Sequence, residues 1–130
     1  MKDLTEILIN ALHEIVEEQW HDPVRVACYF DKSYMQWVDG KNLGYDEFVD
    51  HIAFLKSHTK SMKVNVLATA EEQNTVFTQH QVLVEKSTGE ESLIEVFARF
   101  VFAEGKIIRC EELTRQLKGD PSDRDLGSRL

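Results

Sequence analysis

Four long segments rich in Val, Ile, Phe and Thr fill the second half of this chain and constrain its fold more than any other feature. They span Met62 to Ala70, Thr75 to Glu85, Ser92 to Ala103 and Lys106 to Leu113. β-branched and aromatic residues favour strands, and the breaks between the segments are short and polar or contain glycine, as in hairpins. We therefore predict four consecutive strands that form an antiparallel meander.

The first part of the chain has the spacing of helices instead. Apolar residues recur at helical intervals from Leu4 to Trp20, and Asp3 and Glu6 resemble the start of a capping box. Asp22-Pro23 is typical of an N-cap followed by proline at the first helical position, so a short helix is predicted over Val24 to Phe30. Two helices therefore precede the first strand.

A single strand and a third helix complete the pattern. Tyr34 to Val38 is predicted to be a strand that ends in a turn at Asp39-Gly40, and Asn42 to Gly44 is predicted to be a loop. Apolar residues from Tyr45 to about Lys56 again have helical spacing. Helices segregated from a run of strands indicate the α+β class, with three N-terminal helices packed on a curved sheet.

The length of 130 residues suits one domain, and 42% hydrophobic with 29% charged residues is ordinary for a globular protein. We predict a domain over residues 1–118 and a polar tail over 119–130. The tail has no hydrophobic period, so it is a loop by default. Its Asp and Arg residues, with Leu126 and Leu130, leave open that it folds over a cavity or reaches a partner.

The net charge of -8 argues against two classes of partner, because it repels nucleic acid and anionic membranes. No apolar run is long enough to span a bilayer, and the start, MKDLTEIL, lacks the pattern of a signal peptide. We expect a cytoplasmic protein whose two cysteines, Cys28 and Cys110, are reduced, although a single bridge between them stays possible.

A family resemblance emerges from the element order and from local motifs. Tyr29-Phe30-Asp31 leads into a strand that ends at Val38-Asp39-Gly40, Tyr45 to Phe48 is followed by His51, and Glu111 to Arg115 closes the last strand. Over about residues 4 to 117 this pattern resembles the SnoaL-like branch of the nuclear-transport-factor-two-like superfamily. The resemblance implies a cystatin-like cone: a strongly curved mixed or antiparallel sheet under three helices, enclosing one cavity. The segment 123–129 also resembles a tail of uncharacterised bacterial members.

Relatives in this superfamily have several activities, so the fold alone does not identify a reaction. In the steroid isomerases a carboxylate base stands on the first strand and a neutral carboxylic acid stands on the strand that matches Ser92 to Ala103. In this sequence the acid position falls near Ala98, and the base position falls near Trp37, with Asp39 close by. The isomerase pair is therefore not reproduced, and neither is the Asp-Arg-Asp set of epoxide hydrolases, although Arg99 lies on a suitable strand.

Strand alternation predicts which side chains face the cavity. On Ser92 to Ala103 the apolar set belongs inside: Ile94, Val96, Ala98, Phe100 and Phe102. The resemblance implies that four residues of the neighbouring strand Thr75 to Glu85 face inward: Thr78, His80, Val82 and Val84. On the last strand it implies that Ile108, Cys110 and Glu112 face inward and that Arg109 and Glu111 face outward.

We therefore predict Asp39, His80 and Glu112 as candidate catalytic residues, and the candidate ligand-binding residues are Trp37, His51, Ala98 and Cys110. A carboxylate beside imidazole in an apolar cavity brings a general base near neutral pH. Enolisation next to a carbonyl is the chemistry that would suit such a pair.

Each candidate also has a purely structural interpretation. His80 and His51 could be ordinary histidines at the core border, and Asp39 could serve the turn before Gly40. Glu112 could pair with Arg115 or Arg99. Trp37 could be a core aromatic, and Cys110 is more simply a small buried apolar group than a nucleophile. No histidine pair has a metal-ligand spacing and no glycine loop would cradle phosphate, so no metal or cofactor is predicted.

Three functions follow from these observations. The first is acid–base catalysis on a small apolar or amphipathic molecule, of isomerase, cyclase, dehydratase or hydrolase type. The second is non-catalytic ligand binding. The third is a dimeric interaction module. A homodimer is expected in every case, with Glu95, Phe97 and Arg99 at an interface on the outer face of the sheet.

Overall fold

The computed structural model describes residues 3–123 as three helical segments followed by a long meander. The first half contains α1 (Leu4–Ala11), the π-helix η1 (Leu12–Glu17), α2 (Pro23–Tyr29), β1 (Phe30–Val38), β2 (Lys41–Gly44) and α3 (Tyr45–His58). The second half contains β3 (Thr59–Glu72), β4 (Thr75–Lys86), β5 (Glu91–Ala103), β6 (Lys106–Lys118) and the 3₁₀ turn η2 (Pro121–Asp123).

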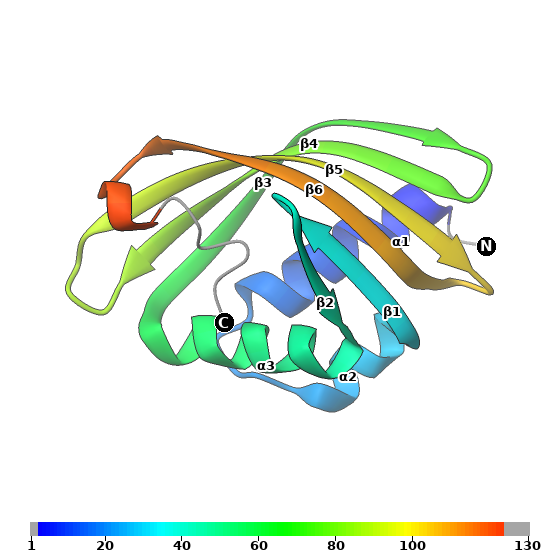
Figure 1. The fold of residues 1–130 in the computed structure, drawn as a ribbon, viewed down its shortest axis with the longest axis horizontal. Helices are drawn as coiled ribbons and strands as arrows, with labels where there is room; N and C mark the ends of the chain where they lie inside the picture. The colour runs from blue at the N-terminus through cyan, green and yellow to red at the C-terminus, as the bar shows by residue number, and fades with distance from the viewer. Residues whose placement is uncertain (1–2, 124–130) are drawn as a thin grey trace.

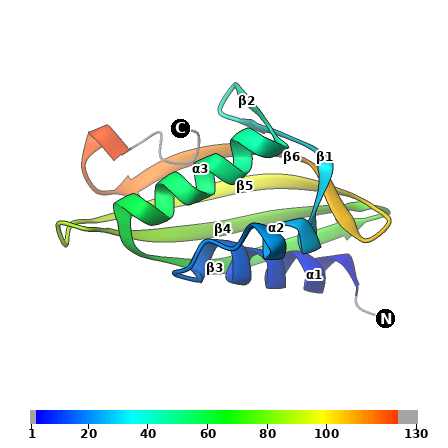
Figure 2. The same cartoon turned by 90° about the horizontal axis from the view of Figure 1, so that it is seen from below.

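The six strands form one mixed sheet in the order β2-β1-β6-β5-β4-β3. All neighbouring pairs are antiparallel except β1 and β6, which run parallel and join the helical half of the chain to the meander. The sheet arches over the helices, with β6 and β5 crossing above α3 and α1 in Figure 1. Figure 2 shows α1, α2 and α3 together on one side of the strands. The predicted α+β architecture is confirmed.

Local sequence signals explain where the helices begin. The Asp3 side chain accepts from the Glu6 backbone N–H at 2.7 Å, and the Asp22 side chain accepts from the Val24 N–H at 3.0 Å. Each carboxylate satisfies a backbone donor that a helix leaves unpaired at its first turn. The first helix ends earlier than predicted: it changes to π geometry at Leu12 and stops at Glu17, so Trp20 lies outside it and is 82% exposed.

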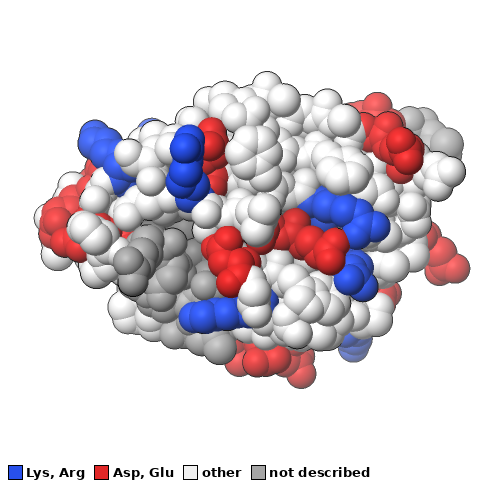
Figure 3. All heavy atoms as spheres, turned by 45° about the horizontal axis from the view of Figure 1, so that its top comes forward, with Lys and Arg blue, Asp and Glu red and all other residues white. Residues whose placement is uncertain are grey.

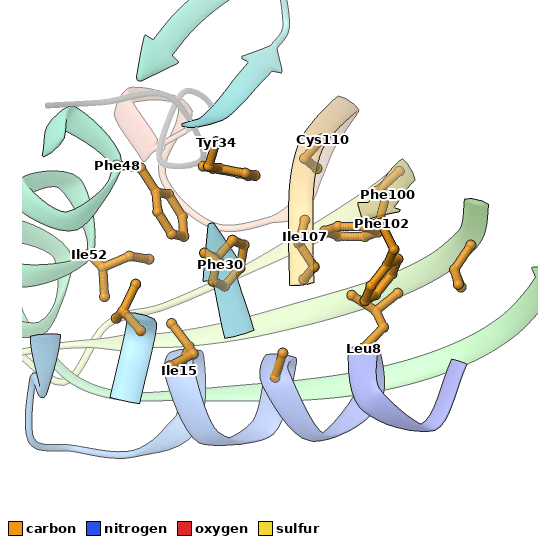
Figure 4. Close-up of a cluster of buried hydrophobic side chains, with 14 of the residues drawn as sticks. Leu8, Ile15, Phe30, Tyr34, Phe48, Ile52, Phe100, Phe102, Ile107 and Cys110 are labelled. Atoms are coloured by element: carbon orange, nitrogen blue, oxygen red, sulfur yellow. The ribbon is translucent and has the colours of Figure 1, made fainter. Parts of the chain in front are cut away.

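The core fills the space between the helices and the concave side of the sheet. Figure 4 shows Leu8 on α1 below Phe102, and Ile15 on η1 below Phe30. Phe30, Tyr34 and Phe48 form an aromatic cluster with ring centroids 4.8–4.9 Å apart. This packing fixes α3 against β1 and so determines the width of the space between them.

Two details of the sheet differ from the sequence-based expectation. Asn42 to Gly44, predicted to be a loop, pairs with β1 as part of the short edge strand β2. A register shift between β5 and β6 leaves Ile108 without a partner, and Ile107 rather than Ile108 is fully buried. A bulge of this kind reverses the alternation on one side of it, which strand periodicity alone cannot predict.

The segment after β6 is anchored as far as residue 123. The Asp123 carboxylate is buried and accepts from Ser92 Oγ at 2.8 Å and Lys86 Nζ at 3.1 Å. Gly119 has φ +122°, and a Cβ there would clash with Ser92, so a glycine is needed where the chain crosses the start of β5. Residues 119–123 therefore pack on the domain, whereas the predicted roles of the rest of the tail fall on residues 124–130, outside the described part of the chain.

Candidate functional site

A cavity of about 130 Å³ lies between the sheet and the helices. Its wall comes from α1, η1, α3 and the five strands β1, β3, β4, β5 and β6, and most of the lining side chains are Leu, Ile, Val or Phe. The polar side chains in the wall are Gln36, His51, His80, Glu112 and Thr114. A small number of polar groups in an apolar wall is typical of sites for small molecules.

Glu112 on β6 is the group best suited to proton transfer. The pKa of its carboxyl is raised to about 7, chiefly by burial; the hydrogen bond from Cys110 lowers the pKa, and the nearby charge of Asp39 raises it. Neither predicted ion pair forms, because Arg115 binds Glu95 at 3.1 Å and Arg99 binds Glu111 at 2.6 Å. A carboxyl with this pKa has both its acid and base forms available near neutral pH.

Cys110 lies on the same face of β6, two residues before Glu112. It is fully buried, and its thiol donates to Glu112 Oε2 at 3.3 Å. Burial, followed by the charge of Glu112, raises the pKa of this thiol well above its usual range. Cys110 is thus a protonated donor to Glu112 and is not among the residues that line the cavity. Both cysteines are unbridged, with Cys28 exposed.

His80 lies on the inner face of β4 and lines the cavity, as predicted. Its Nδ1 is 2.9 Å from Thr78 Oγ1, and burial lowers its pKa to about 4. The ring is therefore neutral at pH 7. His80 does not form the expected pair with Glu112, because β5 separates their strands and two strand spacings amount to roughly 10 Å.

His51 contributes a second imidazole from the opposite wall. It lies on the inner side of α3, is 3% exposed and lines the cavity. The helical spacing of Phe48 and Ile52, both buried beside it, explains why position 51 faces the sheet. The two cavity histidines thus come from different layers of the fold.

The other predicted residues lie elsewhere. Trp37 faces the outer side of the sheet, where the Arg109 guanidinium lies 4.2 Å from its ring centroid, so its expected place in the cavity was wrong. Ala98 belongs to the inner-face core but is not part of the cavity wall. Asp39 is exposed in the turn after β1 and accepts from the Thr114 N–H at 2.8 Å and from the Thr114 hydroxyl. Asp39 therefore ties β1 to β6: its backbone N–H also donates to the Glu112 carbonyl at 3.1 Å, and its charge acts on the Glu112 carboxyl.

Two inward residues of β1 were missed by the sequence analysis. Tyr34 is 1% exposed and Gln36 is 4% exposed, and the Tyr34 hydroxyl donates to Gln36 Oε1 at 2.7 Å. Both side chains line the cavity. Alternation along Tyr34 to Val38 could have found them, since the residues at even positions are all buried.

Within residues 3–123, no group of three or more metal-binding side chains comes together, and no helix is long and apolar enough to cross a membrane. The chemistry available in the described cavity is thus that of a carboxyl group, two imidazoles, an amide and hydroxyls.

Helices under a six-stranded curved sheet give this chain the fold of solved SnoaL-like and NTF2-like proteins. Among solved structures, IdmH, assigned as a polyketide cyclase, from Streptomyces antibioticus has a TM-score of 0.74 at 11% identity, covering 87% of this chain and 92% of that one. A protein assigned as a SnoaL-like polyketide cyclase from Jannaschia sp. CCS1 has a TM-score of 0.69 at 14% identity, covering 85% and 84%. AclR, assigned as a hydroxylase, from Streptomyces galilaeus has a TM-score of 0.70 at 12% identity, covering 98% and 89%.

The chain belongs to the family of an uncharacterized protein of Schizosaccharomyces pombe, with which it is 32% identical over 128 residues, 98% of each protein. No protein-family model matches the sequence. The solved structures confirm the predicted fold, and at identities of 11–14% they transfer no activity.

Proposed function

We propose that the protein binds a small apolar molecule in the cavity and transfers a proton to or from it through Glu112. The observation that carries the proposal is a carboxyl group with a pKa of about 7 in a mostly apolar wall. Proton abstraction next to a carbonyl needs a base of this kind held out of water. Isomerases, cyclases and dehydratases share this step, and two of the structural neighbours are assigned as polyketide cyclases.

Hydrogen–deuterium exchange tests the step without knowledge of the natural substrate. A panel of ketones would be incubated with the protein in D₂O, and loss of the proton on the carbon next to the carbonyl would be followed by NMR. We expect catalysed exchange whose rate rises with pH through about 7, because the carboxylate form of Glu112 is the base. Exchange should fall at least about 100-fold in Glu112→Gln.

The matched control is Glu111→Gln, one residue away on the outer face of the same strand, which should leave exchange unchanged. Ketone binding without exchange would contradict the catalytic proposal and favour the non-catalytic alternative, a ligand-binding module. Equal exchange by the wild type and Glu112→Gln would exclude Glu112 as the base.

We also propose that the outer face of the sheet pairs with a second copy of the chain. Phe77, Phe97 and Leu113 are 44%, 52% and 70% exposed there, beside Trp37. Figure 3 shows this face as a broad uncharged area with acidic and basic side chains interspersed at its edges. Beside the patch Glu111 binds both Arg99 and Arg109, so these charges are paired within one copy and one positive charge is left in excess. An exposed apolar patch of this kind suits an isologous contact with a second copy.

Analytical ultracentrifugation tests the homodimer. We expect the mass of a dimer for the wild type and of a monomer for Leu113→Glu, because a carboxylate at a paired apolar face must be buried without a partner. Val24→Glu, at a 75% exposed position on α2, is the control and should stay dimeric. A monomeric wild type at about 100 μM would contradict the proposal.

A cytoplasmic location completes the proposal. The two unbridged cysteines, one of them exposed on α2, support a reducing compartment. Fractionation of cells that express the chain with a fluorescent tag tests it, and recovery outside the soluble fraction would contradict it.

A further inference from the structure

The side chain of Gln36 is 4% exposed, and its amide nitrogen has no protein acceptor within residues 3–123. Its Oε1 accepts from the Tyr34 hydroxyl, so the same amide must direct its nitrogen, Nε2, the other way. Within residues 3–123 the only side-chain hydrogen bond of Gln36 is the one from Tyr34, and Gln36 lines the cavity. A buried amide whose N–H groups lack an acceptor costs free energy unless water or a ligand supplies one.

Tyr34 holds this amide in one orientation. The tyrosine ring is packed against Phe30 and Phe48, with centroids 4.8 Å and 4.9 Å away, so its hydroxyl cannot move far. Burial also raises the pKa of Tyr34 well above its usual range, so the hydroxyl stays protonated and remains a donor to Gln36. The preorganised amide nitrogen therefore seeks an acceptor from the cavity side.

Gln36 and Glu112 lie on the same wall. In the parallel pairing of β1 and β6, Gln36 is opposite Cys110 and Val38 is opposite Glu112. With a strand spacing of about 4.8 Å and about 6.6 Å along two residues, the Cα atoms of Gln36 and Glu112 are roughly 8 Å apart. One small molecule between them can accept from the amide and present a carbon to the carboxyl group.

The size of the cavity limits that molecule. A dry cavity of about 150 Å³ lined by Leu, Ile and Phe accommodates benzene. The cavity of this protein, at about 130 Å³, has the same scale and a similar apolar lining. It has room for a single ring or an equally short branched chain, but not for two fused rings.

We propose that the ligand is a single-ring or equally small carbonyl compound whose oxygen accepts from the Gln36 amide. This inference rests on the proposed use of the cavity as the ligand site. Gln36 is then a binding residue that selects for the carbonyl, and Tyr34 is the positioning residue behind it. The rest of the wall selects for an apolar body of limited size.

The test compares three probes by titration calorimetry and by the ¹H–¹⁵N resonances of the Gln36 side chain. Cyclohexanone has the carbonyl, methylenecyclohexane has the same shape without the acceptor, and 2-decalone has the carbonyl on two fused rings. We expect cyclohexanone to bind about ten-fold more tightly than methylenecyclohexane and to shift the Gln36 amide resonances, with no detectable binding of decalone.

Gln36→Leu should remove the ten-fold preference, whereas Gln79→Leu, at the outer face of β4, should keep it. Equal affinity of the wild type for the ketone and the alkene would overturn the inference, even if Gln36→Leu failed to fold. Tight binding of decalone would overturn the size limit. Ketone binding that depends on Gln36 but is not accompanied by deuterium exchange would support the inference and contradict catalysis by Glu112. Deuterium exchange that is unchanged in Gln36→Leu would support catalysis by Glu112 and contradict the role of Gln36.

Discussion

The inner and outer faces of the sheet use the same residue types for opposite purposes, and β6 shows this within two residues. Glu112 points into the cavity wall, where burial raises the pKa of its carboxyl to about 7. Glu111 points outward, where hydrogen bonds from Arg109 and Arg99 lower the pKa of its carboxyl. The side of the strand on which a glutamate lies determines its access to solvent and its neighbours. These two factors decide whether the glutamate can transfer a proton or forms an ion pair.

The largest expected difference between the faces is in packing. Phe100 is 2% exposed on the inner face of β5, whereas Phe97 is 52% exposed on the outer face. Phe100→Ala should cost about 3–5 kcal/mol of unfolding free energy, and Phe97→Ala less than about 1 kcal/mol in dilute, monomeric protein. Urea unfolding measures both. Similar costs would show that the two faces are not differently packed.

The next difference is in the sign of the pH dependence. Because the folded-state pKa of Glu112 lies above its usual value of 4.5, its contribution to stability is present below pH 4.5 and is lost as the pH rises to about 7. Glu112→Gln should remove this loss and be more stable than the wild type at pH 8 by up to about 3 kcal/mol.

Glu111→Gln is the control for that measurement, and it should change the stability at pH 8 in the opposite direction. The pKa of Glu111 is lowered in the folded state, so its contribution is present at neutral pH and is lost as the pH falls. Since this group is 39% exposed, the effect should stay below about 1 kcal/mol. If both variants change the unfolding free energy in the same direction at pH 8, the assignment of the two glutamates to opposite faces is contradicted.

His80 should make the inner face sensitive to acid. The folded-state pKa of His80 is about 4, below the usual 6.5. Between these two values the unfolded chain binds the proton more readily than the folded one, so stability is lost as the pH falls from 6.5 to about 4. At pH 5 the His80→Gln variant should keep about 2 kcal/mol more of its neutral-pH stability than the wild type. His58→Gln, at an exposed helix end, should not differ from the wild type, and thermal unfolding across pH would show either result.

The smallest expected effect lies on the outer face. The Arg109 guanidinium lies over the Trp37 ring and is 3.2 Å from Glu111, but all of these groups have access to solvent. In dilute, monomeric protein Arg109→Ala should therefore cost less than about 1 kcal/mol, and the cost should decrease in high salt. A cost above 2 kcal/mol, measured by urea unfolding, would mean that this face is buried in solution.

Much of the fold follows from sequence signals that act locally. The caps at Asp3 and Asp22 and the alternation along β4 and β5 correctly placed helices, strands and the inward side of His80. The bulge at Ile108 and the π-helix at Leu12 could not be predicted, because both depend on how distant strands and helices meet. The length of the edge strand β2 likewise depends on its pairing with β1.

The site was predictable only in part. Glu112 and His51 were found from the family resemblance, and both line the cavity. Trp37 was placed on the wrong side because the family pattern was aligned one position off the alternation of β1, which also hid Gln36. The value of the Glu112 pKa could not be predicted at all, since it arises from burial by side chains scattered over the whole chain.

The parallel pairing of β1 with β6 has a consequence for synthesis on the ribosome. Phe30 to Val38 is made early, yet its partner in the sheet extends from Lys106 to Lys118, and the bond from Thr114 to Asp39 joins residues 75 positions apart. Until the last strand emerges, the edge of β1 that pairs with β6 lacks its partner, and its backbone groups stay unpaired. The sheet of the nascent chain is therefore completed only when β6 has been made. A ribosome stalled before residue 106 would present an incomplete sheet that chaperones can bind.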